Sequence, residues 1–140
     1  MIDTHKINQT VLSFDWGEKR IGVAIKLAGE INISPLATVE MGNNPWNQIN
    51  YLIKKHLPDI LVVGRPLNLE GEKTEQTNLA ISFAQKLAKR TNLKVILQDE
   101  TLTTLTALQS MPKKASQKQK KLLVDQLSAK IILEDYLNEV

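Results

Sequence analysis

The chain contains no cysteine, which excludes disulfide bonds, zinc sites with cysteine ligands and thiol nucleophiles, and fits a reducing compartment. No apolar run approaches the length of a membrane-spanning helix. The first residues include an acid and lack the apolar stretch of a secretory signal, so we expect no such signal here. Aromatic residues make up only 4% of the chain. Of the two tryptophans, Trp46 is expected in the core, and Trp16 is expected as a core anchor that could alternatively stack on a base.

The length and composition of the chain indicate one compact globular domain. A chain of 140 residues can bury a hydrophobic core, and 42% hydrophobic with 24% charged residues is ordinary for a soluble protein. The net charge of +3 is mildly basic. Positive charge concentrates over residues 113–121, whose five lysines are Lys113, Lys114, Lys118, Lys120 and Lys121. Such a block often binds phosphate, although on charge alone a solvated loop is the simpler interpretation.

The apolar pattern predicts a meander of three antiparallel strands followed by alternating helices and strands. The strands joined by short turns are predicted over 10–16, 20–27 and Ile31–Glu40. The later elements are predicted as a helix over 45–56, an apolar strand over Ile60–Gly64, a loop over 65–71, a helix over 73–90, a strand over 94–98, and helices over 101–110 and 121–138. This order predicts an α/β fold with a five-stranded mixed sheet and helices on both faces.

The whole chain, residues 1–140, is therefore expected to form a single domain. Residues 1–9 are expected to be a flexible N-terminus, and residues 111–120 a mobile basic loop.

Three carboxylates occupy positions where a carboxylate is structurally unfavourable. Asp15 ends the first apolar strand and Glu100 follows the last one. On a helical wheel, Asp125 lies within about 40° of Ala129 and Ile132, so it lies on the face that should pack on the sheet. Ligands of open α/β sheets bind at the carboxyl ends of the strands. Together, the three acids predict a shared site that holds divalent cations, Mg²⁺ or Mn²⁺.

Each acid also has a simpler interpretation when it is taken alone. Glu100 could be one of several acids at the start of a helix. Asp15 could form the turn before Gly17. Asp125 could form a salt bridge with a lysine. Basic residues near the same edge of the sheet are consistent with phosphate binding, namely Lys19, Arg20 and Arg65 together with the lysines of residues 113–121.

Five sequence blocks resemble the YqgF family in the right order. They are residues 14–24 (FDWGEKRIGVA), 35–38 (PLAT), 63–71 (VGRPLNLEG), 99–104 (DETLTT) and 124–129 (VDQLSA), the last followed by apolar residues up to position 137. This is the family of RNase H-like, Holliday-junction-resolvase-like pre-16S rRNA nucleases. The resemblance spans about residues 10–138, and although each block is weak alone, the five together are specific.

The resemblance implies an RNase H-like fold and a metal-dependent nuclease that matures the 5′ end of pre-16S rRNA in the bacterial cytoplasm. It assigns Asp15, Glu100 and Asp125 as catalytic metal ligands for Mg²⁺ or Mn²⁺. The implied partners are pre-rRNA or a DNA junction and a precursor of the ribosomal subunit, with no membrane. The protein is expected to be a monomer or a weak homodimer.

Several positions depart from the family pattern. Trp16 stands where Phe or Leu is common, Arg65 replaces an apolar residue, and Thr101 stands where Arg is common. Ser128 occupies the position of a fourth carboxylate that related junction resolvases carry, which weakens the expectation of resolvase activity more than that of metal binding. Two alternatives therefore stay open beside rRNA maturation: a Holliday junction resolvase, and a non-catalytic RNA- or ribosome-binding factor. An actin-like ATPase is disfavoured because the chain is too short for two lobes.

Overall fold

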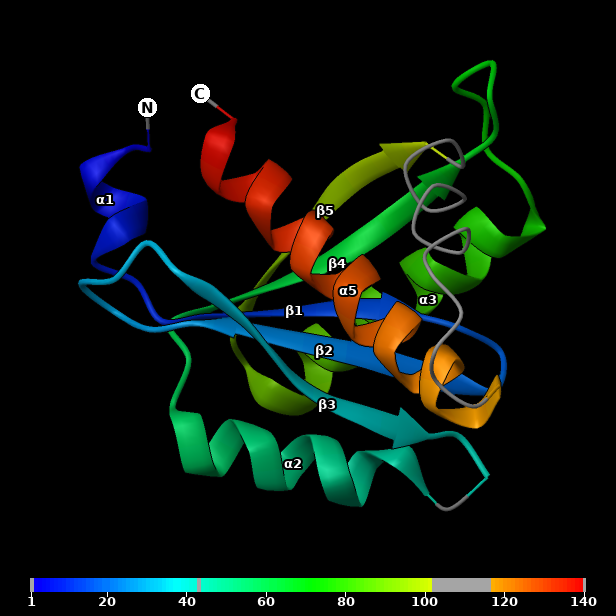
Figure 1. Ribbon diagram of the computed structural model, residues 1–140, viewed down its shortest axis with the longest axis horizontal. Coiled ribbons are helices and arrows are strands. Elements are labelled where there is room, and N and C mark those ends of the chain that lie inside the picture. Colours follow the sequence, from blue (N-terminus) through cyan, green and yellow to red (C-terminus); the bar gives the residue numbers. More distant parts are fainter. Residues whose placement is uncertain (1, 43, 102–116, 140) are drawn as a thin grey trace.

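The fold is a five-stranded sheet in the order β3-β2-β1-β4-β5 with helices on both faces (Figure 1). The computed structural model describes residues 2–42, 44–101 and 117–139, and for residues 117–122 the backbone alone. The elements are α1 (Thr4–Ile7), β1 (Val11–Trp16), β2 (Arg20–Lys26), β3 (Ile33–Glu40), α2 (Pro45–His56), β4 (Ile60–Leu67), α3 (Glu75–Thr91), β5 (Lys94–Thr101) and α5 (Gln117–Asn138). None of the helices in the described ranges is long and apolar enough to cross a membrane.

The predicted mixed sheet is confirmed. β1, β2 and β3 form the antiparallel meander, while β4 pairs in parallel with both β1 and β5. The two faces of the sheet carry separate hydrophobic cores. Alternate residues of the strands, such as Leu12 and Phe14, pack with Ile49 of α2 and Leu87 of α3. The intervening residues, such as Val11, pack against α5.

β4 and β5 are longer than the sequence predicts. Residues 65–67 were expected in a loop because of Pro66, but Arg65, Pro66 and Leu67 pair with residues 99–101 of β5. The pairing of β4 with β1 ends at Val63, and the next bridge on that side is between Leu67 and Lys73, so Pro66 faces an open side. A proline lacks an N–H group and is tolerated where a strand has an open edge. The extension keeps Glu100 inside a strand rather than in the loop after one.

Three further predictions have different outcomes. The last helix begins at Gln117 rather than at residue 121. The predicted helix over 101–110 and most of the basic loop over 111–120 lie outside the described residues. Within residues 1–9 the structure has the short helix α1, and the ammonium group of the fully buried Lys26 donates to the carbonyl oxygens of Ile7 (2.8 Å) and Gln9 (2.7 Å). The flexibility of this segment in solution stays a prediction.

α5 lies directly against the backbone of the sheet and crosses it from β2 towards β5. A Cβ atom at Gly22 of β2 would overlap the backbone carbonyl of Asp125, and one at Gly64 of β4 would overlap the side chain of Ile132. Between them, the hydroxyl of the buried Ser13 donates a hydrogen bond of 2.6 Å to the carbonyl of Ala129. The small residues on the sheet therefore determine how closely, and where, α5 can approach.

We expect Gly22→Ala to destabilise the protein by about 1–3 kcal/mol, because a methyl group there displaces α5 from the sheet. Gly42→Ala is the matched control, since a Cβ atom at Gly42 meets no atom within 4 Å. Urea unfolding of the two variants and the wild type measures the difference. Equal free energies of unfolding for Gly22→Ala and the wild type would contradict the close contact.

Candidate active site

The three predicted carboxylates all lie on the α5 side of the sheet, towards the carboxyl ends of β1 and β5. Asp15 follows Val11 and Ser13 on the face of β1 that packs against α5. Glu100 lies on the same face of β5 as Ile96 and Gln98. Asp125 reaches this region because its backbone rests on Gly22, the residue paired with Asp15 across β1 and β2.

Electrostatic coupling shows that the acids are neighbours. The pKa of Asp15 is raised from 3.8 to about 7, first by burial and then by the negative charge of Asp125. The charge of Asp15 in turn contributes to a raised pKa at Glu100. Asp15 therefore lies within electrostatic range of both other acids.

Asp125 has a cationic partner. The guanidinium Nε of Arg20 donates to Oδ2 of Asp125 over 2.8 Å, and both side chains are about one fifth exposed. The alternative interpretation of Asp125 expected a salt bridge to a lysine, and the structure places an arginine there instead. Arg20 was predicted as a phosphate-binding residue. Its contact with Asp125 places one positive charge beside the carboxylates.

Glu100 lies among other acids. Its pKa is raised from 4.5 to about 9 by burial, by a side-chain hydrogen bond with Asp135, and by the charges of Asp135, Asp15 and Glu139. A hydrogen bond between two carboxyl groups needs a proton on one of them. Only 3% of Glu100 is exposed, and among the residues that the structure describes its buried Oε1 atom has no hydrogen-bond partner. A buried carboxylate oxygen without a partner is costly unless a cation or donor completes it.

Asp135 is the site residue that sequence reasoning missed. It lies ten residues after Asp125 on α5, which places it about 80° around the helix, at the border of the apolar face. The available signal was this border position near the end of a helix that is directly followed by a further acid, Glu139. Ser128, at the position of a possible fourth carboxylate, is buried. The fourth acid near the trio thus comes from a different turn of α5.

The carboxylate oxygens of the site are suitable ligands for a divalent cation, although the carboxylates do not all point to one position. Within the described ranges, no group of three or more His, Asp or Glu side chains is arranged to hold a metal ion. The contacts explain this, because Asp125 is directed to Arg20 and Glu100 to Asp135. Carboxylate oxygens are nevertheless the ligands that Mg²⁺ and Mn²⁺ prefer, and Glu100 Oε1 is left without a partner.

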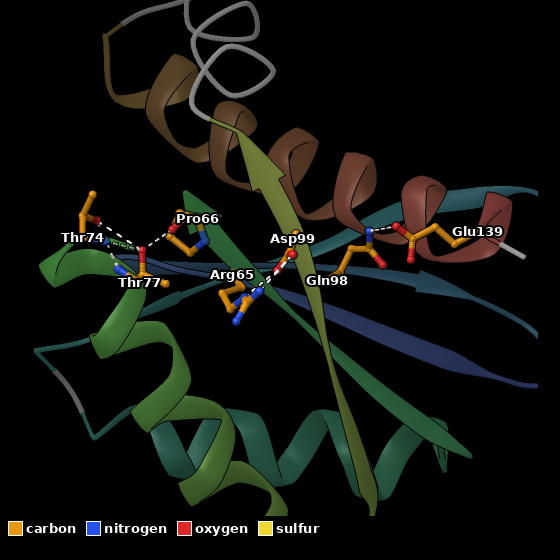
Figure 2. A network of polar contacts seen from close by, with 7 residues as sticks. All are labelled: Arg65, Pro66, Thr74, Thr77, Gln98, Asp99 and Glu139. Atoms are coloured by element: carbon orange, nitrogen blue, oxygen red, sulfur yellow. Dashed lines mark hydrogen bonds and ion pairs between the residues drawn. The ribbon is translucent and has the colours of Figure 1, made fainter. Parts of the chain in front are cut away.

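The other face of the same strand ends carries a second polar network (Figure 2). Arg65 of β4 binds Asp99 of β5 through two hydrogen bonds, Nε to Oδ1 at 2.5 Å and Nη2 to Oδ2 at 2.9 Å. The hydroxyl of Thr77 in α3 donates to the carbonyl of Pro66, the residue paired with Glu100. These contacts hold the ends of β4 and β5 together and so stabilise the strand that carries Glu100.

The predicted phosphate-binding residues fall into three groups. Lys19 is exposed in the turn between β1 and β2, directly before Arg20. Arg20 and Arg65 are paired with acids. Lys113 and Lys114 lie outside the described residues, and Lys118, Lys120 and Lys121 fall in the first turns of α5, where only the backbone is described.

The fold and the acidic site define an α/β protein similar to junction resolvases in architecture. The solved structure described as "T. thermophilus RuvC in complex with Holliday junction substrate" superposes with a TM-score of 0.51 and 13% sequence identity, covering 91% of this chain and 94% of that one. At this identity the likeness shows the fold. It agrees with the predicted RNase H-like mixed sheet.

The chain belongs to the RuvX family. The family model described as "RuvX: Holliday junction resolvase" matches residues 9–139. A "Putative pre-16S rRNA nuclease" of Shewanella denitrificans is 41% identical over 133 residues, covering 93% of this chain and 94% of the relative. A protein of the same description from Glaesserella parasuis is 40% identical over 136 residues, covering 95% and 99%. The family resemblance of the sequence blocks is thereby confirmed.

In metal-free solution we expect Asp15→Asn to stabilise the protein at pH 8 but not at pH 4. The pKa of Asp15 rises from 3.8 to about 7 on folding, so the folded state binds more protons between these values. The free energy of unfolding therefore falls as the pH rises through this window. Asparagine removes the cost of the buried charge, which is at most about 4 kcal/mol at about 1.4 kcal/mol per pKa unit.

Thermal unfolding in EDTA at pH 4 and pH 8 measures this difference. The control is Glu30→Gln, an exposed carboxylate in the turn at the other end of the sheet. If Asp15→Asn melted at or below the wild-type temperature at pH 8, Asp15 would not be a strained buried acid.

Proposed function

We propose that this protein is a metal-dependent nuclease that hydrolyses phosphodiester bonds in the 5′ region of precursor 16S rRNA. The observation that carries the proposal is Glu100, a buried carboxylate near Asp15 at the strand ends, whose Oε1 has no hydrogen-bond partner among the described residues. A cluster of acids without a cation would repel a phosphodiester, so the arrangement is better explained as a cation site that a phosphate approaches. The choice of rRNA rests on the descriptions of the two curated relatives.

Asp15, Glu100 and Asp125 would hold one or two Mg²⁺ or Mn²⁺ ions. When bound, such ions lower the pKa of the attacking water and stabilise negative charge on the phosphate oxygens. The remaining roles belong to the chain. Arg20 orients Asp125 through their 2.8 Å contact and adds positive charge near the phosphate. The hydrogen bond of Asp135 holds the Glu100 carboxyl group in place. The exposed Lys19 binds the nucleic-acid backbone beside the site.

A second candidate is the resolution of four-way DNA junctions. The description of the matching family model favours it. Ser128, buried where related resolvases carry a fourth carboxylate, argues for the rRNA substrate instead. On the rRNA proposal the protein acts in the cytoplasm on a precursor of the small ribosomal subunit, as a monomer or weak homodimer. Arg65 and the lysines of residues 113–121 would add contacts to the backbone of the nucleic acid.

The nuclease proposal predicts cleavage of a labelled precursor rRNA 5′ segment in Mn²⁺ or Mg²⁺ and none in EDTA. Asp15→Asn should reduce the cleavage rate at least about 100-fold, because even residues that only support metal ligands typically contribute 10- to 100-fold. Glu30→Gln is the matched control for carboxylate-to-amide change and should cleave at the wild-type rate. A four-way DNA junction is assayed in parallel.

The outcome of that assay distinguishes the rRNA nuclease from the two alternative functions. Selective cutting of the junction would move the protein to the resolvases. Absence of cutting on both substrates, with equal RNA binding by the wild type and Asp15→Asn, would leave a non-catalytic RNA-binding factor.

Binding to RNA should weaken as salt rises, and Lys19→Ala should flatten this dependence. For single strands the slope of log affinity against log salt falls by about 0.7 for each phosphate contact that is lost. Lys54→Ala removes an exposed lysine in the last turn of α2 and is the control. Fluorescence anisotropy of a labelled RNA at several salt concentrations measures the slopes. Identical slopes for Lys19→Ala and the wild type would remove Lys19 from the interface.

A further inference from the structure

Trp16 lines an open groove on the face of the sheet opposite to the carboxylates. It follows Asp15 directly at the end of β1, and because side chains alternate along a strand, it points towards α2 and α3. It packs on the hydrophobic core from its edge and remains partly exposed. The Cα atoms of the two residues are about 3.8 Å apart. The groove therefore begins one residue after Asp15, on the other face of the sheet at the carboxyl end of β1.

Two adjoining hollows form this feature, which we call the Trp16 groove. The outer hollow, of about 670 Å³, is lined by Trp16, Glu18, Thr74, Glu75, Gln76 and Leu79. The inner one, of about 150 Å³, shares Trp16 and Leu79 and continues to Trp46 and Lys86. The volume of the outer hollow lies within the range of small-molecule sites. The groove thus has room for a planar ring against the indole.

The ring of Trp16 is free to stack. Trp46 is already occupied, since it stacks on Phe83 with 5.6 Å between ring centroids and carries the guanidinium of Arg90 at 4.4 Å. Among the residues that the structure describes, no aromatic ring or cation lies on Trp16. Leu79, which extends the apolar wall, is 44% exposed. Two large apolar side chains thus meet water at the mouth of the groove.

The charge of the residues that line the Trp16 groove favours the bases of a nucleic acid over its phosphates. Glu18 and Glu75 repel phosphate, whereas their carboxylate oxygens can accept hydrogen bonds from the amino and imino groups of base edges. Gln76 and Thr74 add further polar groups. Single-stranded nucleic acids are typically recognised by stacking unpaired bases on aromatic side chains and by hydrogen bonds to their edges. The backbone would remain beside Lys19, next to Glu18 in the turn.

We infer that the Trp16 groove binds one unstacked base of the single strand whose backbone passes the carboxylates, with Trp16 as the stacking platform. This inference rests on the proposed function for the presence of nucleic acid, but not on catalysis. It gives a separate purpose to the tryptophan that stands where Phe or Leu is common, and it predicts that the protein distinguishes strands with bases from strands without them at this position.

The test compares two labelled single strands of equal length, one RNA and one with the same backbone but a run of abasic positions. Binding is measured by fluorescence anisotropy in EDTA, so that no cleavage occurs. The wild type should bind the RNA about 10-fold more tightly than the abasic strand, the fold-change expected for one stacked base. Trp16→Leu should bind both strands equally, while Trp16→Phe should keep most of the preference. Circular dichroism checks that the variants are folded.

A second readout uses the indole itself. Titration of unlabelled RNA into Trp46→Phe, which leaves Trp16 as the single tryptophan, should quench the fluorescence, and titration of the abasic strand should not. The inference would be overturned if Trp16→Leu kept the preference for bases, or if RNA binding left the fluorescence unchanged, even if the protein cleaves RNA. A smaller molecular mass of Trp16→Leu in solution would also overturn it, because the groove would then join two copies of the chain. A base preference that depends on Trp16 in a protein without cleavage activity would support the inference while the nuclease proposal fails.

Discussion

The contact between the backbone of α5 and Gly22 of β2 is the constraint on which the rest of the site depends. A helix normally packs on a sheet through side chains that keep the two backbones apart. Here the missing side chain at Gly22 lets the carbonyl of Asp125 reach the strand, and Ser13 fixes the next turn through Ala129. This places Asp125 over the residue paired with Asp15, and it carries the later turns of α5 towards β5. One close contact thus sets the position of every acid on the helix.

The negative charge of each acid is reduced in a different way. Asp125 is neutralised by Arg20, Glu100 shares a hydrogen bond with Asp135, and Asp15 responds to burial by a raised pKa. All three interactions reduce the negative charge at the carboxylates. Because Arg20 is a permanent cation, it offsets the charge of Asp125 whether or not a metal is bound. A proton, an arginine and a divalent cation are therefore alternative partners for the same small group of oxygens.

Much of this arrangement follows from residue patterns, and the rest depends on where α5 crosses the sheet. The ends of the predicted strands and the helical wheel lead to the expectation that Asp15, Glu100 and Asp125 share a site. Partners such as Arg20 and Asp135 are set by the angle and register of the helix, which local periodicity does not encode. The ends of β4 and β5 were underestimated for a related reason. Pro66 signals a loop, and its place on an open strand side is visible only once the neighbouring pairings are known.

The distance along the chain between the components of the site has a consequence for synthesis. β1 and its carboxylate leave the ribosome early, whereas α5 is translated last among the described elements. Protein synthesis is slow compared with the folding of small domains, so the sheet can form while α5 is still being made. Until then the face with Val11 and Ser13 lacks its cover, and Asp15 has no Asp125 beside it. The acidic cluster is therefore incomplete until α5 has been made and has packed on the sheet.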